Sequence, residues 1–157
     1  YDSWMVTDRL KENNIPVIIQ HIHSLPNQPE DDVDLPYKLP KLLHDAGVSY
    51  CLQYNADMEQ MGTRNLPFVA GTAIAYGLTY EEGVASITLN AAKILGVDKE
   101  LGSIEEGKNA TLFVSEGDAL DMRTSNVFIA FIDGRMVNLD NHQSRNYNKY
   151  KTKYGLE

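Results

Sequence analysis

The sequence is poor in cysteine, because Cys51 is the one cysteine among its 157 residues. A single thiol can form neither an internal disulfide framework nor a cysteine-rich zinc module, so both are excluded. Cys51 stands in the apolar run VSYCL at residues 48–52. We therefore expect it to be a small buried residue of the core, which leaves the redox compartment open.

Long apolar runs and an excess of basic residues are also missing. No run approaches the roughly 20 apolar residues of a membrane-spanning helix, so the sequence predicts no such helix. Fourteen Lys and Arg against 22 Asp and Glu give a net charge of −8, the opposite of a nucleic-acid binder's basic surface. The hydrophobic share of 43% is typical of a folded globular domain.

The first third of the chain alternates predicted helices and strands. A helix around Trp4 and Leu10 precedes the β-branched run 15–19, and a helix over 37–46 precedes the run 48–52. Short continuous apolar runs are typical of strands buried on both faces of a parallel sheet. The spacing therefore predicts parallel βα units.

The middle third is predicted to be helical. Asn65 is a candidate N-cap for a helix with Pro67 in its first turn and Gly77 at its end. Thr79 and Glu82 match the T-x-x-E capping box of a second helix. A third helix is expected over 90–95.

The last third changes to strands and ends in a basic helix. We expect a strand over 111–114, and a hairpin whose strands, 127–131 and 135–139, flank Asp133-Gly134. Tyr147, Tyr150 and Tyr154 share one face of a terminal helix otherwise rich in Lys and Asn. This aromatic stripe either fixes the helix to the protein surface or, with the basic residues, contacts an anionic partner.

His21 and His23 follow directly on the first predicted strand. Functional groups of βα proteins collect at the carboxyl ends of parallel strands. If the backbone stays extended, both imidazoles point to the same side. They would then bind a metal with a third ligand from elsewhere, or hydrogen-bond a substrate or the protein itself. His44 and His142 are expected to be solvated surface residues.

The second predicted strand leads to further polar residues. Asp57 is a candidate general base or metal ligand, with a solvated loop aspartate as the alternative. Arg64 precedes a helix start. It would either hold an anionic or carbonyl group or be an ordinary surface arginine. The sequence contains no G-x-S-x-G elbow, P-loop or dinucleotide-binding fingerprint.

Four segments, in this order, resemble the amidohydrolase superfamily. They are TRNLP with AG and AYGL (63–78), TLNAAKILG (88–96), LGSIEEGKNATL (101–112) and FIDGRMV (131–137). In that family they follow the last barrel strand, form the next helix, return into a small β-sandwich and close it with a hairpin. The imidazolonepropionase-like branch is the most similar.

The resemblance implies an α/β fold, namely the last βα units of a (β/α)8 TIM-like barrel followed by the C-terminal portion of a small β-sandwich. It implies barrel over residues 1–97, sandwich over 98–140 and a helical tail over 141–157. Residues 15–20 would be strand seven and residues 48–53 strand eight. The chain would then be the last part of a longer protein.

The implied activity is metal-dependent hydrolysis of C–N bonds in linear or cyclic amides by the complete protein. The family's strand-eight aspartate lines up with Asn55, and Asp57 lies two residues on, so these two are the catalytic candidates. An asparagine accepts no proton at neutral pH. His21, His23 and Arg64 are the candidate substrate-binding residues.

No metal ligand is assigned within this chain, because the family's ligands come mainly from earlier strands. The resemblance implies a divalent metal, zinc above all, in the complete protein. Its partners would be the rest of its own barrel or a companion chain, a small-molecule substrate and a second copy in a homo-oligomer. Because Asn55 stands where the family has an aspartate, a second hypothesis is a catalytically inactive relative that binds a small molecule or acts as a partner subunit.

Overall fold

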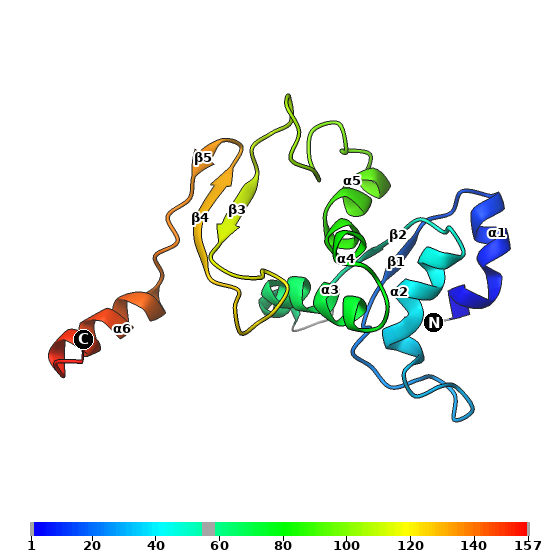
Figure 1. The fold of residues 1–157 in the computed structure, drawn as a ribbon, viewed down its shortest axis with the longest axis horizontal. Helices are drawn as coiled ribbons and strands as arrows, with labels where there is room; N and C mark the ends of the chain where they lie inside the picture. Colours follow the sequence, from blue (N-terminus) through cyan, green and yellow to red (C-terminus); the bar gives the residue numbers. More distant parts are fainter. Residues whose placement is uncertain (1, 55–58, 157) are drawn as a thin grey trace.

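The computed structural model describes residues 2–54 and 59–156. A parallel pair of strands and a three-stranded antiparallel sheet lie at two sides of a central group of helices (Figure 1). The helical elements are η1 (Asp2–Val6), α1 (Thr7–Glu12), α2 (Leu35–Asp45), η2 (Glu59–Asn65), α3 (Leu66–Ala75), α4 (Tyr80–Ile87), α5 (Leu89–Leu95) and α6 (His142–Lys153). The strands are β1 (Val17–Ile19), β2 (Tyr50–Leu52), β3 (Leu112–Ser115), β4 (Val127–Ile132) and β5 (Arg135–Met136).

β1 and β2 pair in parallel, as the alternation of helices and strands predicts. Val17 lies opposite Tyr50 and Ile19 opposite Leu52, and the Gln53 amide extends the pairing by donating to the Ile19 carbonyl at 3.0 Å. All three residues of β2 are buried, Cys51 included. The expectation of burial on both faces is wrong for β1, because Ile18 is 49% exposed and no described element covers its face.

The core lies where α2 and α3 pack against this parallel pair. Leu43 of α2 is fully buried, as is Ala70 of α3, and both join Leu52 in one cluster. α2 begins at Leu35, two residues before the expected start, and Pro36 occupies its first turn, where the missing N–H leaves no bond unmade. Gly47 follows α2 with φ of 72°, a conformation that glycine adopts without strain.

The three central helices follow the predicted order, with one local correction. Asn65 precedes α3, but its side chain makes no capping hydrogen bond, because its backbone is already helical with φ of −87° and ψ of −4°. Pro67 lies in the first turn of α3 as expected. α5 ends at Leu95, and Gly96 takes the left-handed conformation with φ of 72°.

The predicted capping box at the start of α4 is confirmed. The Glu82 amide donates to Thr79 Oγ1 at 3.3 Å, and the Thr79 amide donates to Glu82 Oε2 at 2.7 Å. This backbone hydrogen bond is the main reason why the pKa of Glu82 is lowered. Its folded-state pKa lies below the unfolded value, so its contribution to stability is present at neutral pH and is lost as the pH falls through the folded pKa.

Replacing Thr79 with alanine is expected to lower the free energy of unfolding by about 1 kcal/mol, because the Glu82 amide at the start of α4 loses the hydroxyl that accepts its hydrogen bond. Chemical denaturation measures the change. Thr79→Ser is the matched control, since serine keeps the accepting hydroxyl. Equal losses in both variants would show that the methyl group, rather than the cap, stabilises this turn.

The antiparallel sheet contains the predicted hairpin. Asp133 and Gly134 both have positive φ, 51° and 74°, which is the backbone of a type I′ turn between β4 and β5. β5 is shorter than expected, with only Arg135 and Met136 paired to β4. Phe113 of β3 and Phe128 of β4 are each 49% exposed, so the described residues leave much of the apolar surface of this sheet uncovered.

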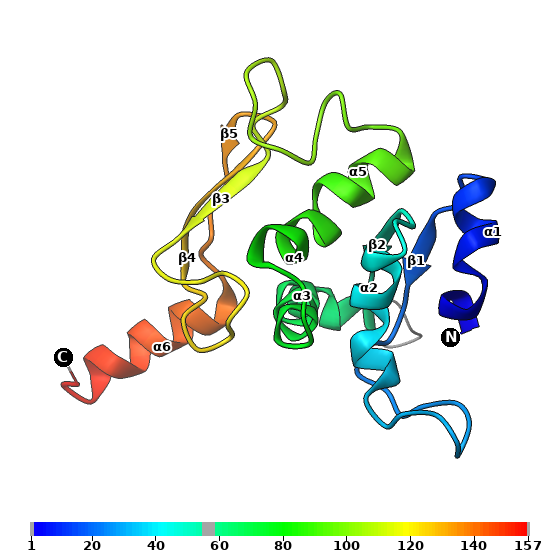
Figure 2. The same ribbon diagram turned by 45° about the vertical axis from the view of Figure 1, so that its right-hand side comes forward.

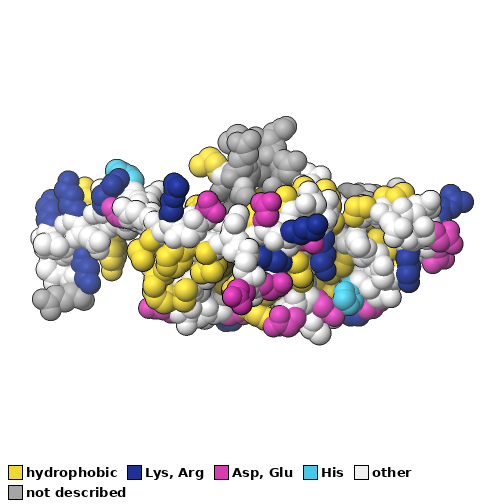
Figure 3. Space-filling view, turned by 90° about the horizontal axis from the view of Figure 1, so that it is seen from above, with side chains coloured by type: hydrophobic (Ala, Val, Ile, Leu, Met, Phe, Trp, Pro, Cys, Tyr) yellow, Lys and Arg dark blue, Asp and Glu magenta, His cyan; other side chains and the backbone are white. Residues whose placement is uncertain are grey.

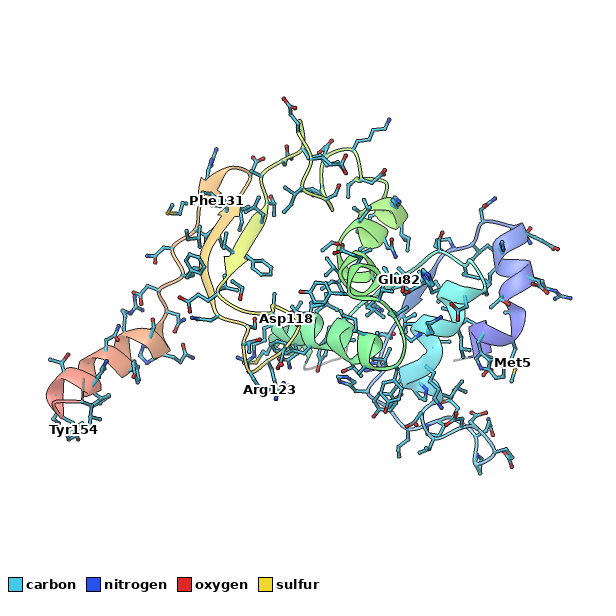
Figure 4. The ribbon with its side chains drawn as sticks, viewed as in Figure 1. Met5, Glu82, Asp118, Arg123, Phe131 and Tyr154 are labelled. Carbon is cyan, nitrogen blue, oxygen red and sulfur yellow. The ribbon has the colours of Figure 1, made fainter. Side chains whose placement is uncertain are left out.

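A loop over residues 116–126 connects β3 to β4 and reaches the central helices. Its residue Leu120 is 7% exposed and joins the main core. Asp118 accepts a hydrogen bond from the Tyr80 hydroxyl at 2.9 Å and another from the Leu120 amide at 2.8 Å. Figure 4 shows Asp118 close to the helices, with Arg123 further out in the same loop. The loop therefore joins the antiparallel sheet to α3 and α4.

The terminal helix α6 forms as predicted, but it does not pack on the protein through its aromatic stripe. Tyr147 is 66% exposed and Tyr154 65% exposed. α6 extends away from the other described elements (Figures 1 and 2). Lys and Arg side chains gather at this end of the molecule, next to hydrophobic side chains at the position of the antiparallel sheet (Figure 3). Tyr150 and Tyr154 contact each other instead, with ring centroids 6.4 Å apart.

Within residues 2–54 and 59–156, no helix combines the length and the apolar character that crossing a membrane requires.

Candidate functional site

The candidate site lies at the carboxyl ends of β1 and β2. Because the two strands are parallel neighbours, their carboxyl ends meet at one edge of the sheet. Gln20, His21 and His23 follow β1, and Gln53 and Tyr54 follow β2. The arrangement confirms that the parallel pairing brings these two segments together, as the sequence predicts.

His21 does not continue the strand, so the extended backbone that would point both imidazoles to the same side is not present. Its φ is 55°, in the left-handed region, and the Ser24 hydroxyl donates to its carbonyl oxygen at 2.8 Å. This turn ends the alternation of an extended backbone. Ile22, between the two histidines, is 2% exposed and anchors the turn in the core.

His23 is held by α3. Its Nε2 lies 2.8 Å from Oγ1 of Thr72, and Thr72 Oγ1 also donates to the Phe68 carbonyl at 3.0 Å. The structure thus gives His23 a polar partner 49 residues away in sequence. Sequence reasoning missed Thr72, because a threonine inside a helix carries no pattern that marks it as a partner for a distant imidazole.

Two tyrosines extend the site beside His23. The rings of His23 and Tyr37 have centroids 6.0 Å apart, and Tyr37 stacks on Tyr76 at 5.1 Å. Burial, followed by the charge of Asp34, raises the pKa of Tyr76. Its hydroxyl therefore stays neutral at physiological pH. The three rings come from the loop after β1, from α2 and from the residue that follows α3. Both tyrosines were missed, since their sequence positions indicate only helix faces.

The remaining predicted residues are placed only in part. Arg64 is the second-last residue of η2, with Asn65 between it and α3, and it is exposed. Asn55 and Asp57, the catalytic candidates, lie outside the described residues. The structure therefore locates three of the five predicted positions, and the contact with Thr72 orients the ring of His23.

The described residues do not fit a metal ion by themselves. In the ranges 2–54 and 59–156, no three His, Cys, Asp or Glu side chains are grouped as a metal would require. His21 and His23 are separated by the turn at φ of 55°. A metal bound near this edge would need ligands from other strands of a barrel, so no chemical step is assigned to one here.

Two hollows flank the parallel pair. One, of about 230 Å³, runs along β1 and includes Ser3, His21 and Leu39 in its lining. The other, of about 530 Å³, opens at the amino ends of the strands, opposite the candidate site. There His44 Nε2 lies 2.9 Å from Glu82 Oε1, so His44 is a partner of α4 as well as a surface residue. Burial, helped by the charge of Glu82, raises the pKa of Tyr50 to about 12.

Comparisons with known proteins agree with this geometry. The model of the amidohydrolase family matches residues 10–138. An imidazolonepropionase of Shouchella clausii is 41% identical over 69 residues, which are 43% of this chain and 15% of that protein. Amidohydrolase tasK of Hapsidospora irregularis is 31% identical over 94 residues, 60% of this chain and 9% of that protein.

A solved amidohydrolase structure from Thermotoga maritima MSB8 superposes with a TM-score of 0.75 and 31% identity. The match covers 87% of this chain and 35% of that one. The chain thus spans a minor part of the length of its relatives. Structural neighbours of this kind imply a TIM-barrel-type fold for the βα units of this chain. The chain itself contains the α/β elements and the small antiparallel sheet described above. Since the family model matches more than half of its residues, the chain belongs to the amidohydrolase family.

Proposed function

We propose that the complete protein hydrolyses C–N bonds of linear or cyclic amides and that this chain supplies the carboxyl ends of its last two barrel strands. The observation that carries the proposal is the family match over residues 10–138 together with the polar residues after both parallel strands. The imidazolonepropionases among the relatives support cyclic amides as the substrate class.

The proposal assigns barrel to residues 1–97, sandwich to 98–140 and a helical tail to 141–157. β1 and β2 would be strands seven and eight. The remaining strands would come from the rest of the same polypeptide or from a companion chain, because the paired strands expose backbone edges that need cover. Ile18, 49% exposed on β1, lies where such cover would bury it.

In this proposal, Arg64 donates hydrogen bonds to the carbonyl or carboxylate of the substrate, and His21 and His23 bind its polar groups. Asn55 and Asp57 remain the catalytic candidates, with Asp57 as the group able to accept a proton. A divalent metal, zinc above all, would be held by residues outside this chain. A bound metal of this kind lowers the pKa of water and polarises a carbonyl.

Arg64→Ala is expected to lower kcat/KM for an amide substrate tenfold to about a hundredfold, because a charge-assisted hydrogen bond is worth roughly 1.5–3 kcal/mol. The assay uses the complete protein and a panel of five- and six-membered lactams and hydantoins. Arg9→Ala is the matched control, since Arg9 is an exposed arginine on α1. Equal activity in both variants would contradict the assigned role of Arg64.

Elemental analysis of the complete protein separates the hydrolase from the alternative. A stoichiometric divalent metal together with amide turnover supports the hydrolase. Neither metal nor turnover, with retained binding of a lactam, would favour a catalytically inactive small-molecule-binding relative. The asparagine at position 55, where the family has aspartate, is the sequence observation that favours this second function.

A further inference from the structure

We infer that Thr72 selects the tautomer of the His23 imidazole that carries its proton on Nε2 over the one that carries it on Nδ1, which leaves Nδ1 to accept a hydrogen bond from an amide N–H of the substrate. The role of Nδ1 rests on the proposed function, whereas the tautomer follows from the protein alone. Thr72 is a positioning residue in this inference, and the substrate class it selects is a secondary amide rather than a fully substituted one.

The direction of the hydrogen bonds follows from counting protons at Thr72. A threonine hydroxyl has one hydrogen and can accept at its lone pairs. The Phe68 carbonyl has no hydrogen, so the 3.0 Å contact requires Thr72 to donate. Oγ1 can then only accept from His23 Nε2, 2.8 Å away. The opposite tautomer would leave one of these two contacts without a proton.

The free energy of a hydrogen bond decides between the tautomers. With the proton on Nε2, both contacts of Thr72 are hydrogen bonds. With the proton on Nδ1, Thr72 must donate to either His23 or Phe68, and one hydrogen bond is lost. This loss makes the Nδ1 tautomer about tenfold less populated than the Nε2 tautomer. Thr72 is half-buried, so water replaces the lost partner poorly. The contact therefore selects a tautomer as well as a ring position.

An aromatic neighbour accompanies this hydrogen bond on the exposed ring of His23. Tyr37 lies beside it at 6.0 Å between centroids, and Tyr76 stacks behind Tyr37. No described residue hydrogen-bonds Nδ1 of His23 in the ranges 2–54 and 59–156. Arg64, near the end of η2, can only donate. Under the proposed function, an unprotonated Nδ1 of His23 accepts from the N–H of the amide whose C=O Arg64 binds.

The tautomer is tested by two-bond ¹⁵N–¹H NMR of the complete protein labelled at histidine, at mildly alkaline pH, where an imidazole is neutral. His23→Gln identifies the signal by its loss. We expect a protonated Nε2 and a bare Nδ1. Thr72→Ser is expected to keep these shifts, while Thr72→Val moves them toward a mixture. A protonated Nδ1 in the wild type, or identical shifts in the valine variant, would overturn the inference.

The substrate arm compares a lactam with its N-methyl analogue. The wild type is expected to prefer the N–H compound at least about tenfold in affinity or kcat/KM, and His23→Leu is expected to lose most of that preference. An unchanged preference in His23→Leu would overturn the role of Nδ1. If neither lactam is bound or hydrolysed, the proposed function is wrong. The NMR measurement still decides which tautomer His23 adopts, because it needs no substrate.

Discussion

Leu43→Ala is expected to lower the free energy of unfolding by about 2–5 kcal/mol, the largest effect of any substitution considered. Leu43 is fully buried between α2 and the parallel pair. Truncation removes its apolar surface from the core and leaves a cavity that the surrounding strand and helix fill only in part. Chemical denaturation followed by circular dichroism measures the loss.

Its neighbour on the same helix provides the control. Leu42 is 38% exposed, so Leu42→Ala is expected to cost roughly 1 kcal/mol or less. Both variants replace leucine by alanine in α2 and change helix propensity equally. If the two substitutions cost the same, α2 does not face the sheet in the way described.

Gly71→Ala is expected to lower the free energy of unfolding by about 1–3 kcal/mol, although alanine is the better helix former. A Cβ atom at position 71 would lie 2.4 Å from the Leu120 carbonyl oxygen, so the helix or the loop must shift to accommodate it. The loop cannot move away cheaply, because Asp118 binds the Leu120 amide and the Tyr80 hydroxyl. The extra atom therefore separates the loop from α3.

Two measurements check this prediction. Denaturation gives its sign, since alanine without a clash would stabilise α3 by up to about 1 kcal/mol. Trypsin cleavage at Arg123, which lies in the same loop with an 83% exposed side chain, is expected to become faster. Stabilisation with unchanged cleavage would contradict the close approach of α3 and the loop.

Leu43→Ala and Gly71→Ala are expected to affect the candidate site in different ways. Leu43 fills the core behind the parallel pair, and its carbonyl accepts from the Val48 amide just before β2. Gly71 adjoins Thr72, the residue that contacts His23. A shift of α3 at Gly71 is therefore expected to disturb His23 as well, so the NMR signals of its ring should change in Gly71→Ala and stay unchanged in Leu42→Ala.

The elements that sequence reasoning predicted best have local causes. The capping box at Thr79 and Glu82 is formed within one helical turn, and the turn at Asp133-Gly134 needs only two residues of positive φ. Both patterns are short and chemically specific. The parallel pairing of residues 17–19 with 50–52 was also predictable, because a helix between two apolar runs returns the chain in the same direction.

Predictions that depended on distant contacts succeeded less well. The alternation of His21 and His23 assumed an extended backbone, but Ile22 is drawn into the core and His21 turns to φ of 55°. The stripe of tyrosines on α6 suggested packing that the described structure does not contain. In both cases a periodic pattern fixes which side chains share a face, but not what lies opposite that face.

The amino-acid sequence alone determined the family, the order of the βα units and the segments that end at the candidate site. These depend on motifs and on periodicity, which are properties of neighbouring residues. Only the tertiary structure decided that Thr72, 49 residues from His23, holds its ring, and that Leu120 lies against Gly71. Such contacts depend on how helices and loops pack across the chain, and no local pattern of residues encodes their partners.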